Sequence, residues 1–296
     1  MEKNKYKEIT VIIVTFKSDH IIHKCLKNID ENFKIILIEN SDNHDFTSKL
    51  EKEYKNLKCI NMGYDAGYGS ALNVGIKLSK TDFVICINPD SFPDRDCFEK
   101  LLITSKSQEN IALVAPLTLI KNNTQESSAY GFFSNKKDRI KNSQNNMFVD
   151  WVHGNVFLLN KKIMDRIGYF DENIFIEFDE IDLQQRIFKA GKKTVINFNA
   201  KSQHLEGKSA DPKYSFEMKC EHSWHHSWSK FYYFKKHFGY IKALKECLPR
   251  AILDIIKSIV FFILLDKKKT KIYILFFLGF FNSFIGKKSF YRAILD

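Results

Sequence analysis

The sequence lacks paired cysteine motifs and any recognisable nucleic-acid-binding motif. Its six cysteines form no CxxC pair and no zinc-finger spacing, and Cys86 lies within an apolar run. We therefore expect reduced, mostly structural thiols, as in cytosolic proteins. No signal peptide is expected, because residues 1–8 are polar and the apolar run that follows is short. We expect no nucleic-acid partner.

Apolar runs of the roughly 18 to 20 residues needed to cross a bilayer are also missing. Residues 230–296 nevertheless combine two shorter apolar stretches with 14 Lys and Arg against 4 Asp and Glu, whereas residues 1–229 carry 32 against 31. We predict a domain boundary here, with a basic, apolar, helical extension over 230–296 that associates with an anionic membrane surface. The alternative is a pair of helices packed on the rest of the chain or on a second subunit.

The chain does contain an alternation of apolar β-branched runs with helical spacings, within a length of 296 residues that can bury a sizeable core. This alternation predicts an α/β fold built on a parallel, right-handed βαβ sheet. Residues 121–146 are polar and are predicted to form a loop or a β-ribbon. Strands are predicted at 9–15, 33–38, 57–60, 83–87, 111–116, 150–159 and 194–198.

A carboxylate follows the most apolar of these strands. Phe83–Ile87 has the pattern of a central strand buried on both faces, and Asn88, Pro89 and Asp90 come directly after it. Open α/β sheets bind ligands at the carboxyl ends of their strands, so Asp90 is well placed to bind a metal. His204 follows the strand at 194–198 in the same sense, and carboxylate with histidine is an acceptable site for Mn²⁺ or Mg²⁺. A purely structural role is the alternative for this histidine.

Residues 61–70 form a glycine-rich segment before a predicted helix. Its three glycines let the backbone approach a ligand closely, and the helix N-terminus favours a phosphate. A plain glycine-rich turn is the alternative. The segment is not a GxGxxG motif directly after the first strand, which disfavours a classical dinucleotide-binding fold.

Four acidic residues lie within residues 177–182. Glu177 and Asp182 are interpreted either as functional groups or as acids that compensate the dipole of the following helix. Apolar neighbours flank Asp179 and Glu180, so at least one of these two is expected to face a pocket. Partial burial would raise its pKa and suit it to general-base catalysis. The later histidine cluster at 222, 225 and 226 is interpreted as helical with aromatic packing, with a metal site as the less favoured alternative.

Taken in order, several of these motifs resemble those of family 2 glycosyltransferases, in particular the rhamnosyltransferase-like branch. They are VIIVTF, IENSDN, NMGYDAGYGSALNVGI, INPDS, HGNVFLLNKKIMDRIGYFDE, FIEFDEIDLQQR and QHLEGKS, over about residues 9–209. The resemblance implies a GT-A fold, a Rossmann-like mixed sheet flanked by helices, here with the C-terminal membrane-associating extension. It also implies an inverting enzyme, in which a base deprotonates the acceptor hydroxyl while a divalent cation stabilises the leaving nucleoside diphosphate.

The resemblance also implies roles for individual residues. Asn88-Pro89-Asp90 corresponds to the DxD motif of the family, and Asp90 and His204 would hold the Mg²⁺ or Mn²⁺ ion. Glu180 falls at the position of the catalytic base, but the two acids are swapped relative to the usual Glu-Asp order, so Asp179 is a second candidate. The donor-binding set would be Thr15, Glu39, Asn61, Gly63, Gly67, Asn73, Asn88 and Asp90. The acceptor-binding set would be Trp151, His153 and Asp182.

The expected function is transfer of a sugar, with L-rhamnose as one candidate, from a nucleotide-sugar to a bacterial surface glycan or a lipid-linked acceptor. The expected location is the inner face of the plasma membrane, as a peripheral protein, and homo-oligomerisation is left open. The alternative is a non-catalytic, membrane-bound carbohydrate-binding or scaffold protein derived from such an enzyme, because the acids are swapped and Asn88 replaces an Asp. A nucleotidyltransferase is disfavoured, because Phe16-Lys17-Ser18 supplies no glycine-rich loop after the first strand.

Overall fold

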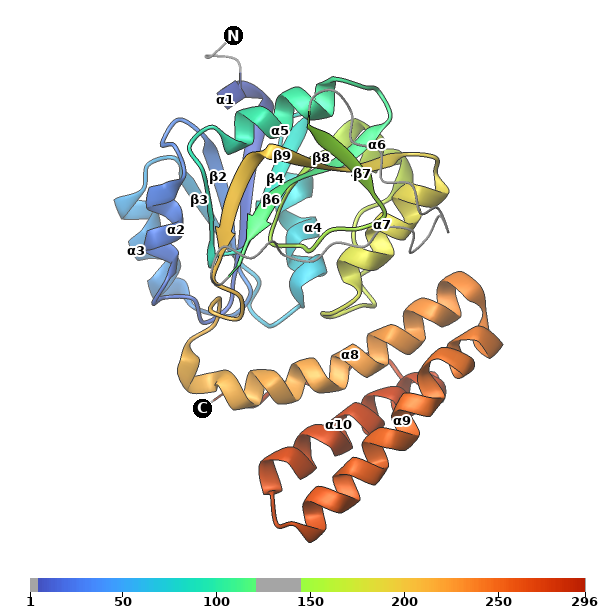
Figure 1. Cartoon of the computed structure of the whole chain (residues 1–296). Helices are drawn as coiled ribbons and strands as arrows, with labels where there is room; N and C mark the ends of the chain where they lie inside the picture. The colour runs from blue at the N-terminus through green and yellow to red at the C-terminus, as the bar shows by residue number, and fades with distance from the viewer. Residues whose placement is uncertain (1–4, 121–144, 296) are drawn as a thin grey trace. The chain divides into compact units, whose positions relative to one another are not determined.

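The computed structural model describes residues 5–120 and 145–295, which form two compact units (Figure 1). Unit 1 comprises the described residues up to Phe170 together with Leu183–Asp211, and unit 2 comprises Asp171–Asp182 together with the chain from Pro212 onward. The boundary predicted at 229/230 falls within helix α8 (Ser215–Phe238), which is continuous. That division by charge stays a prediction. The loop predicted at 121–146 lies almost wholly outside the described residues.

Unit 1 is organised around a mixed nine-stranded sheet. The strands occur in the order β3-β2-β1-β4-β8-β6-β9-β5, and β7 pairs with β9. The first four of these are parallel to one another, and β8 is antiparallel to both β4 and β6. The strands are β1 (Ile9–Thr15), β2 (Lys34–Glu39), β3 (Leu57–Asn61), β4 (Phe83–Ile87), β5 (Ser91–Pro93), β6 (Ile111–Leu119), β7 (Asn146–Val149), β8 (Val156–Asn160) and β9 (Lys193–His204).

Side chains of β1 point alternately to two separate cores, one on each face of the sheet. Ile9, Val11 and Ile13 pack with residues of α2, α3 and α5, whereas Ile12 and Val14 pack with residues of α4, α6 and α7. The period-2 alternation of a strand therefore explains why its run of seven residues is buried throughout. The helices of unit 1 are α1 (Lys5–Glu8), α2 (Ile22–Asn28), α3 (His44–Glu53), α4 (Tyr68–Leu78), α5 (Cys97–Lys106), α6 (Lys161–Ile167) and the greater part of α7 (Asp179–Lys189).

The strand predicted at 150–159 is shorter in the structure, where β8 begins only at Val156. The backbone N–H and C=O of Val152 are taken by the side-chain amide of Gln184, at 2.8 and 2.9 Å. The side chain of Asn155 accepts the N–H of Val156 at 2.6 Å. At Val152, the backbone therefore bonds to a side chain where a strand would bond to a neighbouring strand.

Unit 2 is built from the segment Asp171–Asp182, a short 3-10 helix at Pro212–Tyr214 and three long helices, α8, α9 (Tyr240–Ile263) and α10 (Lys267–Phe284). Two apolar clusters hold the helices together. One contains Phe231, Cys247 and Phe280, and the other contains Trp224 and Leu275. In the described part of the chain, no helix has both the length and the apolar character needed to cross a membrane.

Candidate functional site

Three predicted donor-binding residues lie side by side at the carboxyl edge of the parallel strands. Thr15 pairs in register with Glu39, and Glu39 pairs with Asn61. The hydroxyls of Thr15 and Ser41 donate to the two carboxylate oxygens of Glu39 at 2.6 and 2.5 Å. Burial raises the pKa of Glu39, and these two hydrogen bonds oppose the rise only in part. The strand register thus assembles a polar row where an open sheet binds ligands.

The glycine-rich segment is held in place by the side chains of Asn40, which follows β2, and of its own Asp65. Gly63 and Gly67 adopt positive φ angles of 74° and 85°, a region that L side chains rarely adopt. Asn40 donates to the carboxylate of Asp65 at 2.7 Å and accepts the N–H of Ala66 at 3.0 Å, while Asp65 accepts the N–H of Gly67 at 3.2 Å. Gly67 is the residue that precedes α4, so these contacts fix where that helix begins.

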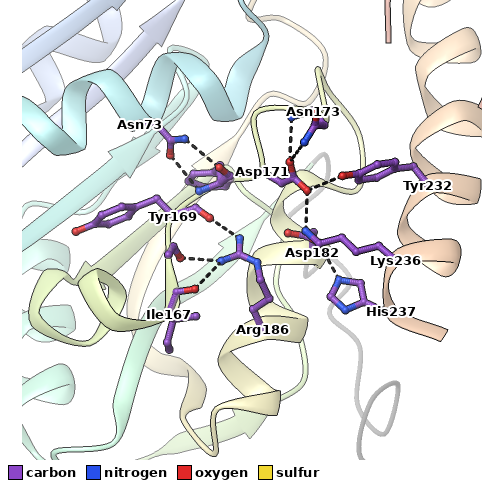
Figure 2. Close-up of polar contacts among 12 residues, drawn as sticks. Asn73, Ile167, Tyr169, Asp171, Asn173, Asp182, Arg186, Tyr232, Lys236 and His237 are labelled. Carbon is purple, nitrogen blue, oxygen red and sulfur yellow. Dashed lines mark hydrogen bonds and ion pairs between the residues drawn. The ribbon is translucent and has the colours of Figure 1, made fainter. Parts of the chain in front are cut away.

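Asn73 is buried within α4, and its side chain contacts the protein backbone. Its amide donates to the C=O of Phe170 at 2.9 Å and accepts the N–H of Phe170 at 3.0 Å, as Figure 2 shows. The structure gives this residue a structural role, since it ties α4 to the chain that follows α6. Its predicted contact with the donor stays a prediction.

The structure brings Asp90 and His204 together. Asp90 is fully buried, and its Oδ1 lies 3.5 Å from Nε2 of His204. Its Oδ2 accepts the backbone N–H of Lys208 at 3.0 Å. Burial opposes ionisation of Asp90, but His204, the Ser209 hydroxyl and the Lys208 N–H together outweigh it and lower the pKa of this carboxyl. Asp90 is therefore held as a carboxylate beside an imidazole.

This pair fits a divalent cation of the Mg²⁺ or Mn²⁺ type. Oδ1 of Asp90 and Oδ1 of Asn88 are both buried and have no hydrogen-bond partner among the described residues. Hard cations prefer such carboxylate and amide oxygens, and Mn²⁺ also accepts an imidazole nitrogen. In the described ranges 5–120 and 145–295, no group of three or more His, Cys, Asp and Glu side chains is arranged to hold a metal. The protein alone would supply few ligands, as expected where substrate phosphates supply others.

Trp151 and His153, the predicted acceptor-binding pair of unit 1, lie on the segment before β8. Their rings pack edge to face with centroids 4.9 Å apart. The indole N–H of Trp151 is buried and has no hydrogen-bond partner among the described residues. Gly154, which directly follows His153, accepts a hydrogen bond from the Tyr68 hydroxyl at 2.8 Å. A buried indole N–H without a partner is a donor available to a bound ligand.

The remaining predicted residues belong to unit 2. Asp179 is buried, and its Oδ2 has no hydrogen-bond partner among the described residues. Burial, reinforced by the neighbouring Glu180, raises the pKa of Asp179 well above its ordinary value. Asp182 is also buried, but it lies 2.6 Å from Lys236 Nζ and 2.7 Å from His237 Nε2 (Figure 2). The structure thus gives Asp182 a structural ion pair, and its acceptor role stays a prediction.

Sequence reasoning missed Asn155, Asp65 and Lys208. Asn155 lies 3.3 Å from Nδ1 of His204, and its backbone C=O accepts the N–H of Asn88. Asn155 therefore contacts His204 and also Asn88, the residue two positions before Asp90. The sequence signal for Asn155 was its place in the HGNVF motif. Lys208 bonds to Asp90 through its backbone N–H, so the identity of its side chain does not indicate the contact.

Comparison with known proteins decides the family. The profile described as "Glycosyl transferase family 2" matches residues 10–168, which is more than half of the chain. The chain belongs to glycosyl transferase family 2. The matched region contains the polar row, the glycine-rich segment and Asp90.

Relatives within the family are distant. The low-salt glycan biosynthesis hexosyltransferase Agl10 of Haloferax volcanii is 22% identical over 199 residues, which cover 63% of each protein. The chain therefore spans less than two thirds of that relative's length. The N-acetylglucosaminyl-diphospho-decaprenol L-rhamnosyltransferase of Mycobacterium tuberculosis is 21% identical over 238 residues, which cover 68% of this chain and 77% of the relative.

Solved structures confirm the fold class. A mannosyltransferase from Pyrobaculum calidifontis, solved with GDP-mannose and Mn²⁺, matches with a TM-score of 0.55 at 12% identity. The match covers 93% of this chain and 86% of the mannosyltransferase. The predicted mixed α/β fold of GT-A type is therefore confirmed, and so is the predicted family.

Proposed function

We propose that this family 2 protein is an inverting glycosyltransferase that moves a sugar from a nucleoside diphosphate to an acceptor hydroxyl. The observation that carries the proposal is the set of polar groups at the carboxyl edge of the sheet. The row Thr15, Glu39 and Asn61 offers contacts for a nucleoside. Asp90 follows the fourth parallel strand at that same edge, where it lies beside His204 of β9. The site roles of these residues are part of the proposal.

A divalent cation is the proposed cofactor, held by Asp90 and His204 with Asn88 nearby. When bound, it would supply positive charge for the diphosphate that departs. The pyrophosphate would also find backbone N–H groups at the start of α4, where Gly67 allows close approach.

Glu180 is the proposed general base. The Asp179 carboxyl is buried and has a raised pKa, so it keeps its proton to higher pH than an ordinary aspartic acid. While it carries that proton, it cannot take one from the acceptor hydroxyl. Glu180 is only partly buried, and we assign to it the role of taking the proton from the acceptor hydroxyl. A protonated Asp179 can donate a hydrogen bond to Glu180, which orients the carboxylate.

The proposed acceptor is a hydroxyl of a surface glycan or of a lipid-linked glycan, and L-rhamnose is one of the donor sugars to test first. Support comes from the relatives, because one is named for glycan biosynthesis and another as an L-rhamnosyltransferase acting on a diphospho-decaprenol compound. Trp151 and His153 are the acceptor-binding residues that we propose in unit 1.

An anionic membrane surface is the proposed partner of unit 2, which would place the protein peripherally on the inner face of the plasma membrane. Apolar side chains that are 41% to 71% exposed recur along one face of α9 at intervals of three, four or seven residues. Lys267, Lys268 and Lys269 begin the next helix, so positive charge accompanies the apolar stripe. The stripe consists of Ile241, Leu248, Ile252, Ile256, Ile259 and Ile263.

The function is tested by nucleoside-diphosphate release from a panel of nucleotide-sugars, with lipid-linked and soluble glycan acceptors and with or without Mn²⁺. We expect one donor to be used and Asp90→Ala and Glu180→Gln each to lower kcat by about 10² or more. Glu31→Gln is the matched control, because Glu31 is an exposed acid that precedes the amino end of β2. Inversion is read from the anomeric configuration of the product.

Two outcomes would count against the proposal. Full activity of Glu180→Gln would remove Glu180 as the base. Binding of a donor without turnover, under conditions that include a lipid-linked acceptor, would favour the non-catalytic carbohydrate-binding protein.

Membrane binding is tested by co-sedimentation with vesicles of phosphatidylglycerol or of phosphatidylcholine. Ile256→Asp should weaken binding to the anionic vesicles by about 10-fold or more, because burying one such side chain contributes about 1.5 to 3 kcal/mol. Ile103→Asp is the matched control, since Ile103 is similarly exposed on α5 of unit 1. Dimerisation that Ile256→Asp abolishes, without any vesicle binding, would show that a second copy covers the stripe.

A further inference from the structure

The segment that carries the proposed base has an unfavourable backbone. Glu177 and Phe178 both have φ of +65°, although neither is a glycine. L-residues avoid this left-handed region, and two such residues in succession persist only when their surroundings hold them. They directly precede Asp179 and Glu180, at the start of α7. Something in unit 2 must therefore hold this segment in place.

Helix α8 supplies contacts at the two strained residues. His222 and His226 are one helical turn apart and so lie on the same face of α8. Their Nδ1 atoms lie 2.8 and 3.2 Å from the two carboxylate oxygens of Glu177. The Phe178 ring packs against His226 and Tyr233, with ring centroids 5.6 and 5.5 Å apart. Each strained residue is thus bound through its side chain to α8.

The same face of α8 also contacts the segment Asp171–Asp182 near its middle and at both of its ends. Close to the middle, the Ser229 hydroxyl donates to the C=O of Ile176 at 2.9 Å. At one end, Tyr232 and Lys236 donate to Asp171 at 3.0 and 2.7 Å.

At the other end, Asp182 receives Lys236 and His237 at 2.6 and 2.7 Å (Figure 2). Lys236 contacts both terminal carboxylates, so the two ends of the segment share one cation. We name these side chains the α8 stripe: His222, His226, Ser229, Tyr232, Lys236 and His237.

We infer that the α8 stripe positions Asp179 and Glu180 for catalysis, with Glu177 as the central positioning residue. The α8 stripe contacts the chain on both sides of the acid pair, since Glu177 comes two residues before Asp179 and Asp182 comes two residues after Glu180. Loss of the Glu177 contacts frees the strained backbone to relax toward ordinary φ values. The acid pair moves with it, and a displacement of about 1 Å in a catalytic group can cost about 10²-fold in rate. The inference rests on the proposed function, because it takes Glu180 as the base.

A metal site was the less favoured interpretation of the histidines at 222, 225 and 226. A metal is not needed to explain the contacts of His222 and His226. Glu177 provides a carboxylate oxygen to each of the two histidines. In the described part of the chain, these residues are not arranged as a group that could hold a metal. The histidines therefore serve as hydrogen-bond donors, with Glu177 as the acceptor.

The test is Glu177→Gln in the full-length protein, which keeps the size of the side chain but removes its charge. We expect kcat to fall by about tenfold or more while the KM for the donor stays unchanged. Amide hydrogen exchange of the peptide covering residues 175–185 should become faster. The matched control is Glu246→Gln, which breaks an exposed ion pair with Lys242 on α9 of the same unit. A second variant, His226→Gln, removes one of the two partners and should give an intermediate result.

Unchanged kcat, or unchanged exchange of this peptide, would overturn the inference. A fall in kcat for Glu246→Gln equal to that for Glu177→Gln would also overturn it, because the effect would then be general to the unit. Failure of the proposed function would be recognised by a different measurement. Should Glu180→Gln remain fully active, Glu180 is not the base, while the exchange measurement on Glu177→Gln still decides whether α8 holds the segment.

Discussion

Gly279 of α10 lies at the closest approach of two helices, and replacing it with alanine tests the packing of unit 2. A Cβ atom at this position would lie 2.0 Å from the backbone oxygen of Trp224 on α8 and 2.9 Å from the carbonyl carbon. Ordinary contacts of a Cβ atom begin at 3.4 Å. The obstacle is backbone, so no side-chain rotamer can relieve the overlap, and α8 and α10 must move apart.

The expected loss of stability follows from two opposing contributions. Overpacking of a well-packed interior costs typically about 1 to 3 kcal/mol, and a clash with backbone belongs at the upper end. Alanine in place of glycine within a helix returns about 1 kcal/mol. We therefore expect Gly279→Ala to lower the free energy of unfolding of unit 2 by about 2 kcal/mol. For a unit of about 100 residues, this corresponds to a fall in Tm of about 8 to 16 °C.

Thermal unfolding followed by tryptophan fluorescence measures the effect, because Trp224 and Trp228 both lie on α8. Leu278→Ala is the matched control, since Leu278 is the adjacent residue and is 37% exposed. It should lower the free energy of unfolding by less than about 1 kcal/mol. Equal or higher stability of Gly279→Ala would refute the reasoning, because it would mean that α10 does not pack against the backbone of α8 here.

Two further predictions concern the polar contacts of Asn73 and Glu177. Asn73→Ala leaves the N–H and C=O of Phe170 without partners and should lower the free energy of unfolding of unit 1 by about 2 to 4 kcal/mol in urea titrations; a loss below about 0.5 kcal/mol would contradict the structural role. Despite its burial, Glu177 has its pKa lowered to about 2 by hydrogen bonds from His222 and His226, so its stabilisation is complete above pH 4.5 and lost as pH falls toward 2. Hydrogen bonding to Glu177 raises the pKa of His222 against the effect of burial, so that contribution is complete below pH 6.5 and lost as pH rises through the folded-state pKa. Urea unfolding at several pH values should show both losses in the native protein and neither in Glu177→Gln.

Much of the sheet could be predicted from the sequence, because its signals are local. Apolar β-branched runs such as Ile9–Thr15 specify buried strands wherever they pack, and β1 begins and ends at the predicted residues. The same reasoning extended the strand before Asn160 too far. The backbone of Val152 bonds to the side chain of Gln184, 32 residues away, and no local pattern reports such a contact.

The candidate site was predictable in its residue types but not in its contacts. Asp90 and His204 were each identified from their place after a strand, and register pairs the neighbouring Ser91 with His204. The contacts of the two carboxylate oxygens depend on the turn after β9: His204 Nε2 lies 3.5 Å from Oδ1, and Oδ2 accepts the backbone N–H of Lys208. The ligand contacts predicted for Asn73 and Asp182 stay predictions. Their contacts within the folded chain, Asn73 with Phe170 and Asp182 with Lys236 and His237, were not predicted from the sequence.

Residues close together in the chain encode the family, the α/β class, the strands of the N-terminal half and the acidic pair at 179–180, so these could be predicted from local patterns. Other properties appear only in the folded chain: the contacts of α8 with the acidic segment, the two residues at positive φ, and the opposite pKa shifts of Asp179 and Glu177. Burial and the charges of distant residues set these properties. His222 contacts Glu177 across 45 residues of chain, and a contact of that kind exists only once the chain has folded.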